Sequence, residues 1–143
     1  MLLGEYAHTI DAKGRIILPA DFRAALGEHF VIIKGLDQCL FIYGENEWAI
    51  LEQKLRQLPL TKPEARRLVR HFFSGARVLE CDRQGRFLVP GNLRNFAKLE
   101  KDVVLTGVSN RVEVWSKAEW ERYIALEDES TEEFAATLSD LGI

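Results

Sequence analysis

The chain has 143 residues, of which 47% are hydrophobic and 29% charged, and its formal net charge at pH 7 is −3. This composition excludes an intrinsically disordered chain, and the length allows one domain or two very small ones. No apolar run approaches the roughly 18 to 20 residues that span a bilayer, and the N-terminus has no signal-peptide pattern, so we expect a cytoplasmic protein without a membrane partner.

The first half of the chain predicts four short strands and three helices. Two apolar segments flank an Asp-x-x-Gly turn, which predicts a β-hairpin over residues 6–18 that Pro19 ends. Later, apolar residues recur at three- and four-residue steps, which is typical of amphipathic helices. After the hairpin we expect a helix over 21–26, strands over 30–33 and 39–43, and helices over 45–58 and 63–73, the last capped by Thr61 and Glu64.

The second half of the chain predicts the same order of elements. Ser116 and Glu119 have the residue types and spacing of a capping box, and Ser130 with Glu133 can start a last helix in the same way. The acidic residues after Glu127 then form either an interface helix or a solubilising tail. The expected elements are strands over 77–81, 86–89, 103–105 and 111–115, a short helix over 90–97, and helices after 116 and 130.

These matching orders reflect an internal repeat. Residues 11–19 and 82–90 carry Asp, Gly, Arg and Pro at the same offsets, 71 positions apart, with apolar residues in the same gap. Residues 31–35 then match 103–107 at an offset of 72. Such self-similarity indicates a duplicated unit. Each unit has only about 45 residues, near the lower limit for independent folding, so we expect extensive contact between the units and a homo-oligomer.

The repeat defines the predicted domain organisation. We expect the first domain over residues 5–47 and the second over 76–119, with linking helices over 48–75 and C-terminal helices over 120–143. The expected fold class is mainly β with flanking helices.

Catalysis is the weakest functional hypothesis. His8, His29 and His71 do not cluster in the sequence, and no motif of a metalloprotease, a serine hydrolase or a nucleotide-binding loop occurs. Cys39 and Cys81 do not match across the repeat, and neither lies in a C-x-x-C motif, so we expect reduced thiols. The sequence therefore predicts a protein that is not an enzyme, with no cofactor, no catalytic residue and no metal.

Charge is distributed unevenly along the chain. Residues 62–101 contain ten Lys or Arg and four Asp or Glu, whereas residues 113–143 contain two and nine. A local basic face can attract a polyanion although the net charge is negative. Arg66, Arg67 and Arg70 either extend such a face or form a solvated helix surface.

The two Asp-x-x-Gly-Arg turns allow two interpretations. In the structural one, Asp pairs with Arg across the hairpin neck and Gly makes the turn. In the functional one, the cations bind DNA, because Arg forms bidentate hydrogen bonds to phosphate and guanine and a two-stranded ribbon fits the major groove. Two turns per chain, multiplied by an oligomer, would bind by avidity. The residues concerned are Asp11, Lys13, Gly14 and Arg15 in the first turn, and Asp82, Arg83, Gly85 and Arg86 in the second.

The repeated Asp-x-x-Gly-Arg segment ending in Pro, followed by a short helix and a strand pair, resembles the swapped-hairpin unit called the SpoVT-AbrB domain. Two such units in a chain of this length resemble the MraZ family. The match covers essentially the whole chain. It includes residues 4–6, 9–15, 18–19, 72–76, 93–94 and 115–117, together with Arg70 and Trp120.

This resemblance implies a fold and a function. The hairpins of the two units would interleave into a pseudo-two-fold, double-ψ-type β-barrel, and protomers would close into a ring-shaped homo-oligomer. The family consists of bacterial transcriptional regulators that associate with the nucleoid. They bind direct repeats in double-stranded promoter DNA, usually as repressors of their own operon for cell division and cell-wall synthesis.

The resemblance also assigns roles within the turns. The DNA-contacting residues would be Arg15 and Arg86, helped by Lys13 and Arg83. Asp11 and Asp82 would orient those arginines.

The alternative is an interaction or assembly protein, like the AbrB-type antitoxins that bind a protein partner. In that case the Asp-x-x-Gly-Arg turns are structural, and a stoichiometric protein partner would copurify.

Overall fold

The computed structural model describes residues 1–126 and 130–143, so residues 127–129 of the predicted C-terminal segment lie outside the described residues. In chain order the elements are β1 (Leu2–Thr9), β2 (Arg15–Ile17), α1 (Ala20–Leu26), β3 (Phe30–Lys34), β4 (Leu40–Gly44), α2 (Glu45–Arg56), α3 (Pro63–Ser74), β5 (Arg77–Leu79), β6 (Arg86–Leu88), α4 (Gly91–Phe96), β7 (Asp102–Ser109), β8 (Val112–Ser116), α5 (Lys117–Leu126) and α6 (Thr131–Asp140).

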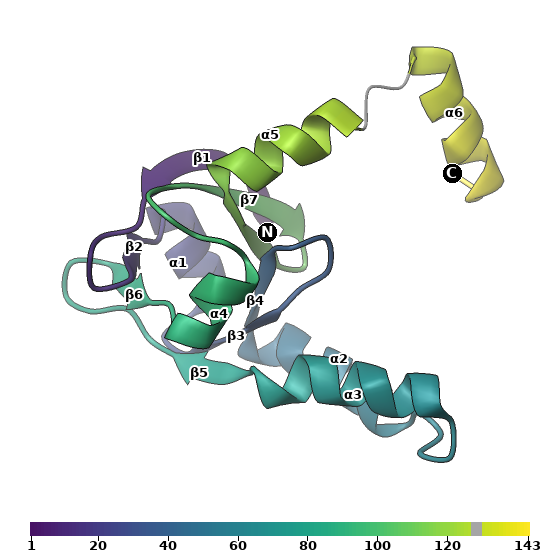
Figure 1. Cartoon of the computed structure of the whole chain (residues 1–143), viewed down its shortest axis with the longest axis horizontal. Coiled ribbons are helices and arrows are strands. Elements are labelled where there is room, and N and C mark those ends of the chain that lie inside the picture. Colours follow the sequence, from purple (N-terminus) through teal and green to yellow (C-terminus); the bar gives the residue numbers. More distant parts are fainter. Residues whose placement is uncertain (127–129) are drawn as a thin grey trace.

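The strands join the two repeats to each other (Figure 1). A six-stranded antiparallel sheet has the order β1-β7-β8-β4-β3-β5, and β2 and β6 form a separate two-stranded ribbon. Four of these pairings cross between the repeats: β1 with β7, β5 with β3, β4 with β8, and β2 with β6. The predicted extensive contact between the units is therefore confirmed.

The hairpin predicted over residues 6–18 is wrong as a local unit. β1 and β2 form one isolated bridge, Ile10 to Ile16, and their ladders are made with β7 and β6 of the other repeat. The turn itself is closed, because the Asp11 N–H donates to the Arg15 carbonyl at 3.0 Å. A lone two-stranded hairpin is marginal in water, whereas the exchange joins β1 to the six-stranded sheet and ties β2 to the other repeat through β6.

The architecture is mixed α/β, with a large antiparallel sheet and flanking helices rather than a mainly β fold. Among the described strands, the ladders form an open sheet and a ribbon and not one closed circuit. None of the described helices combines the length and the apolar character required to cross a membrane.

Each face of the sheet has its own core. The inner face packs against the ribbon and the two short helices through apolar side chains that include Ile16, Phe87, Phe22 and Leu93. The outer face is covered by α2, α3 and α5, and its core comprises Val31, Ile33, Cys39, Phe41, Tyr43, Leu55, Phe72, Val104 and Trp115. Because side chains alternate along a strand, the sheet buries apolar residues on both sides.

The pairing register corrects the sequence alignment of the repeats. Phe30 pairs with Leu79, and Val103 pairs with His8. His8 and Leu79 correspond at the offset of 71, so Phe30 corresponds to Val103 at an offset of 73, not 72. The alignment of Val31 with Val103 is therefore wrong by one residue, a slip that exchanges the two faces of a strand.

The predicted caps have different outcomes. The hydroxyl oxygens of Ser116 and Ser130 accept hydrogen bonds from the N–H groups of Glu119 and Glu133, at 3.0 and 3.1 Å, so both caps are confirmed. The box predicted at Thr61 does not form, because α3 starts one residue later and its N-cap, Lys62, makes no side-chain bond.

The two cysteines are free thiols, Cys39 buried and Cys81 half-buried. Burial raises the pKa of both.

Candidate functional site

The two Asp-x-x-Gly turns lie side by side at one end of the molecule (Figure 1). The β2–β6 ribbon brings them together, since each turn leads into one of its strands. Two further backbone hydrogen bonds, one for each turn, fasten the turns to the opposite repeat. The Leu18 N–H donates to the Gly85 carbonyl, and the Val89 N–H donates to the Gly14 carbonyl, both at 2.9 Å.

Each aspartate organises its own turn. Asp11 Oδ1 accepts from the N–H groups of Lys13 and Arg15, at 3.0 and 2.9 Å, and Oδ2 accepts from Arg15 Nε at 2.7 Å. In the second turn, Asp82 Oδ1 accepts from the N–H groups of Gln84 and Arg86, both at 2.9 Å, and Oδ2 accepts from Arg86 Nε at 2.8 Å. The structural interpretation is thus correct in that each Asp pairs with the Arg of its own turn.

The same contacts leave each guanidinium available for a ligand. In both turns the Nε is held, while no described residue accepts a hydrogen bond from the terminal nitrogens of Arg15 or Arg86. Hydrogen bonds from the backbone, above all from the Arg15 amide, lower the pKa of Asp11, and the Arg86 amide does the same for Asp82. Both carboxylates are charged at neutral pH and orient a planar donor that can bind an anion with its free edge.

The outward face of the ribbon combines charge with apolar surface. Arg15 lies opposite Leu88 and Ile17 lies opposite Arg86, whereas Ile16 and its partner face the core. Ile17 and Leu88 remain 49% and 52% exposed. The two arginines are diagonal neighbours on one face, a spacing of roughly 7–8 Å for such positions.

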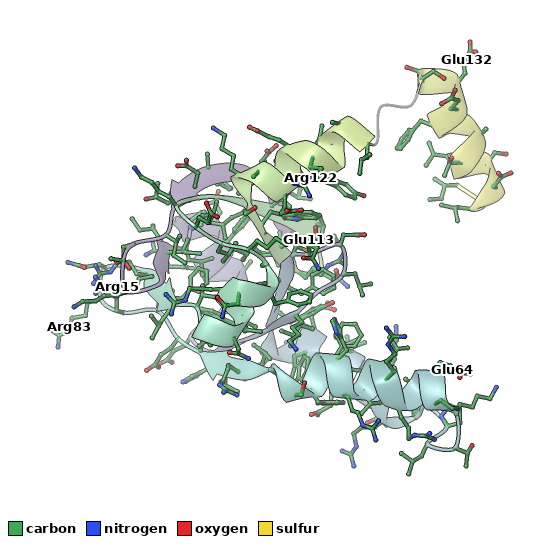
Figure 2. All side chains as sticks on the ribbon, in the orientation of Figure 1. Arg15, Glu64, Arg83, Glu113, Arg122 and Glu132 are labelled. Carbon is green, nitrogen blue, oxygen red and sulfur yellow. The ribbon has the colours of Figure 1, made fainter. Side chains whose placement is uncertain are left out.

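Lys13 and Arg83 are exposed at the tips of the turns. Figure 2 shows Arg83 projecting outward near Arg15. The predicted site residues of both repeats are therefore brought together at one surface.

Two further arginines belong to this surface. The guanidinium of Arg94 lies against Gly14, so closely that a Cβ there would stand 2.6 Å from Arg94 Nη1. Arg23 takes the equivalent place against Gly85. Both glycines have left-handed backbone angles, with φ of +89° and +76°. Each repeat thus supplies a half-buried arginine to the turn of the other repeat.

Sequence reasoning missed Arg23 and Arg94 as site residues, although a signal was present. They are arginines at the same offset of 71 in both units. Their reach to the opposite turn depends on the strand exchange, which the residue pattern does not reveal. With them, the surface carries six cations, Lys13, Arg15, Arg23, Arg83, Arg86 and Arg94, around the carboxylates of Asp11 and Asp82.

The basic residues of α3 lie elsewhere. Helix α3 projects from the body away from the two turns (Figure 1). Arg66 is occupied locally, donating from Nη1 to the carbonyls of Leu60 and Thr61 at 3.1 and 3.2 Å. The hypothesis that Arg66, Arg67 and Arg70 extend the basic face of the turns is therefore wrong.

One group of described side chains has ligand atoms close enough for a metal ion. Atoms of Glu28, His29 and Glu80 lie within 4.8 Å of one another, and all three residues are exposed. His29 Nε2 lies 3.4 Å from a Glu80 carboxylate oxygen. Exposed acidic groups often approach in this way without an ion. The expected absence of a metal stays a prediction.

Comparison with known proteins gives a consistent picture over the whole chain. The family model described as "MraZ protein, putative antitoxin-like" matches twice, over residues 1–71 and 72–141. The chain is 57% identical to a protein of Desulfitobacterium hafniense and 58% identical to one of Thermoanaerobacter sp., each over 100% of both chains. It is 55% identical to a protein of Desulforamulus reducens over 99% of both. Each of the three is named transcriptional regulator MraZ.

Proposed function

Since the chain belongs to the MraZ family, we propose that it is a sequence-specific, DNA-binding transcriptional regulator whose contact surface is the pair of Asp-x-x-Gly-Arg turns. Its relatives are named as regulators and not as enzymes. The observation that carries the proposal is that both turns lie at one surface. There the guanidinium groups of Arg15 and Arg86 are held at Nε, and their terminal nitrogens form no hydrogen bond with a described residue.

Each feature of this surface matches a requirement of duplex recognition. A two-stranded ribbon has the size of the major groove, and Arg can bond guanine or phosphate with two nitrogens. We assign the base or phosphate contacts to Arg15 and Arg86, with Lys13 and Arg83 as additional phosphate contacts. Asp11 and Asp82 orient the arginines, and the buried glycines let Arg23 and Arg94 approach the turns.

The finer function follows the family resemblance. We propose that the protein represses its own operon for division and cell-wall synthesis by binding direct repeats upstream of it. It would act in the cytoplasm at the nucleoid, as a ring-shaped homo-oligomer. Several copies of one weak contact surface in a ring match a DNA site that is itself repeated, which supports this combination.

We also retain two structural proposals. We propose that the strands around the inner core form a pseudo-two-fold, double-ψ-type barrel. The pairing of β2 with β6 and of β1 with β7, each between the two repeats, supports this proposal. The domains would comprise residues 5–47 and 76–119, with linking helices over 48–75 and C-terminal helices over 120–143.

Fluorescence anisotropy tests the proposed contacts. The full chain is titrated with DNA that carries its upstream repeats and with scrambled DNA, across a salt series. We expect the protein to prefer the repeats, and we expect the logarithm of its affinity to fall linearly with the logarithm of the salt concentration. Arg15→Ala should weaken binding by about 5- to 150-fold, the range for one specific arginine contact. Arg122→Ala, at an exposed position on α5, is the matched control and should bind normally.

A second substitution separates base from phosphate contact. Arg15→Lys keeps the charge but loses the bidentate geometry. Retained affinity with lost preference for the repeats would assign Arg15 to a base. Binding of neither DNA at low salt would overturn the proposed function.

One observation favours a second candidate function. Ile17 and Leu88 are half exposed between the arginines, and apolar surface of this kind suits a protein partner. An assembly protein of the antitoxin type would use the same face. Copurification of a stoichiometric protein that Ile17→Ser releases, while DNA binding is absent, would favour this candidate.

A further inference from the structure

The two repeats end in helices with different surroundings. Helix α3 packs on its own repeat, where Phe72 is buried in the core of the outer face. Helix α6 has no buried residue. Figure 1 shows it standing apart from the body, beyond the end of α5.

Helix α6 has the character of an interface helix. Phe134, Leu138 and Leu141 recur at four- and three-residue steps, which places them on one side. Phe134 is 57% exposed and Leu141 is 71% exposed. The acidic residues Glu133 and Asp140 lie beside this stripe on the helical wheel. Residues 127–143 contain six Asp or Glu and no Lys or Arg.

Helix α6 does not find an equivalent surface on its own repeat. In the first repeat α3 covers an apolar part of the sheet, whereas the corresponding part of the sheet in the second repeat is polar. The apolar part in the first repeat includes Ile33 and Phe41, both buried. The pairing register places Thr106 and Glu113 at the corresponding positions. An apolar stripe gains little there, because Thr106 and Glu113 are already buried and Glu113 is hydrogen-bonded to Arg111 and Trp115.

The α2–α3 arm, residues 45–74, offers a better match. Its outer part, residues 54–70, contains six Lys or Arg and one acidic residue. Leu60 and Leu68 are exposed there, at 77% and 43%. Arg67 and Arg70 are exposed and form no ion pair with a described residue.

We propose that α6 of one protomer docks on the α2–α3 arm of a second protomer. The stripe of Phe134 and Leu141 would cover Leu68, and Glu133 and Asp140 would face Arg67 and Arg70. The arm and α6 project from separate parts of the body (Figure 1). A contact between two different surfaces of one chain is heterologous, and such contacts form a ring when the rotation between neighbouring protomers closes, as in the proposed oligomer.

This inference rests on the proposed homo-oligomer and not on DNA binding. The two can fail independently, because assembly is measured here without DNA and the turns are left unchanged.

Charge exchange tests the contact. One variant carries Arg67→Glu and Arg70→Glu, and the other carries Glu133→Arg and Asp140→Arg. Light scattering after size exclusion measures the mass of each variant alone and of their equimolar mixture. We expect each variant alone to dissociate at a protein concentration about tenfold higher than the unmodified chain, as for the loss of close interfacial charge pairs. The mixture should regain the original mass, because reversed α6 then meets the reversed arm on the other protein.

The controls keep the test decisive. Lys101→Glu changes an exposed charge away from the arm and should leave the mass unchanged. Circular dichroism checks that both variants are folded, and Arg66 is avoided because it holds the loop before α3. An unmodified chain that stays a monomer, folded variants that keep the original mass, or variants whose mixture does not reassemble would overturn the inference. Docking within one chain would leave the mass of both variants unchanged.

Discussion

The two turns of the candidate site have nearly the same geometry, whereas the outer faces of the two repeats do not. Asp11 and Asp82 make the same three hydrogen bonds, with corresponding distances that agree within 0.1 Å. On the outer face, Phe41 and Cys39 of the first repeat are replaced by Glu113 and Arg111 of the second. The duplicated chain has kept one half of its unit and changed the other.

The difference follows from what each region contacts. The turns meet in one ribbon, where each turn gives a backbone acceptor to the opposite repeat and receives an arginine from it, so a change in one disturbs both. The outer faces are covered separately. The apolar outer face of the first repeat requires a covering helix, which α3 provides. The polar positions of the second repeat satisfy their own hydrogen bonds and do not require one.

The largest effect should come from removing the anchor of the covered face. Phe72→Ala in α3 should lower the free energy of unfolding by about 3–5 kcal/mol, the usual cost of truncating a buried Phe. Phe134→Ala, an exposed phenylalanine in the free helix α6, should stay within about 0.5 kcal/mol of the unmodified chain under conditions that keep it monomeric. Urea unfolding followed by tryptophan fluorescence measures both.

Equal losses for the two substitutions would break the comparison. A large loss at Phe134 would mean that α6 is packed within its own chain. Dilution separates this outcome from assembly, since only a contact between protomers depends on concentration.

The polar face provides the next test. Glu113 accepts from Arg111 Nη2 at 2.8 Å and from Trp115 Nε1 at 3.1 Å, and the guanidinium lies 4.4 Å from the centre of the Phe41 ring. Glu113→Ala leaves three donors without their acceptor, since Arg111 Nε also donates to Glu113, and we expect a loss of about 2–3 kcal/mol in urea unfolding. Glu113→Phe combined with Arg111→Cys copies the first repeat and should recover part of that loss. A double variant less stable than Glu113→Ala would contradict this account.

How far the sequence predicts this structure depends on the range of the interactions. Local signals were sufficient for most helices and strands, and for the serine caps at Ser116 and Ser130. The cap at Thr61 failed because Lys62 precedes a proline, which disfavours helical backbone angles at Lys62, so Lys62 is extended and the helix starts at Pro63.

Long-range pairing was less accessible. The pattern at residues 6–18 is the same whether the two strands pair locally or with the other repeat, and composition cannot distinguish a register offset of 72 from 73. The eight predicted turn residues do come together, but Arg23 and Arg94 were missed for the same reason. Their partners are glycines of the opposite repeat, which become neighbours only through the exchange.

The glycines give a smaller effect that should be equal in both turns. Gly14→Ala and Gly85→Ala each force a side chain into a left-handed conformation and against an arginine guanidinium. We expect a loss of about 1–2 kcal/mol for each, as for a strained non-glycine backbone. Urea unfolding gives the stability and anisotropy gives the DNA affinity. Gly27→Ala, at a position within the body that has a positive φ and open space, separates backbone strain from displacement of the arginine.

The smallest effect concerns the protonation of the two turn aspartates. Their folded pKa values lie below the ordinary value of 3.8, chiefly because the amides of Arg15 and Arg86 donate to the carboxylates. A lowered folded pKa means that the charged form favours the folded state. This contribution is present above pH 3.8 and is lost as the pH falls through the folded pKa. Carboxyl ¹³C titration by NMR should show both residues below 3.8. Asp82→Asn should leave the titration of Asp11 unchanged, because its donors lie in its own turn; a displaced Asp11 curve would show that the turns are coupled through the ribbon.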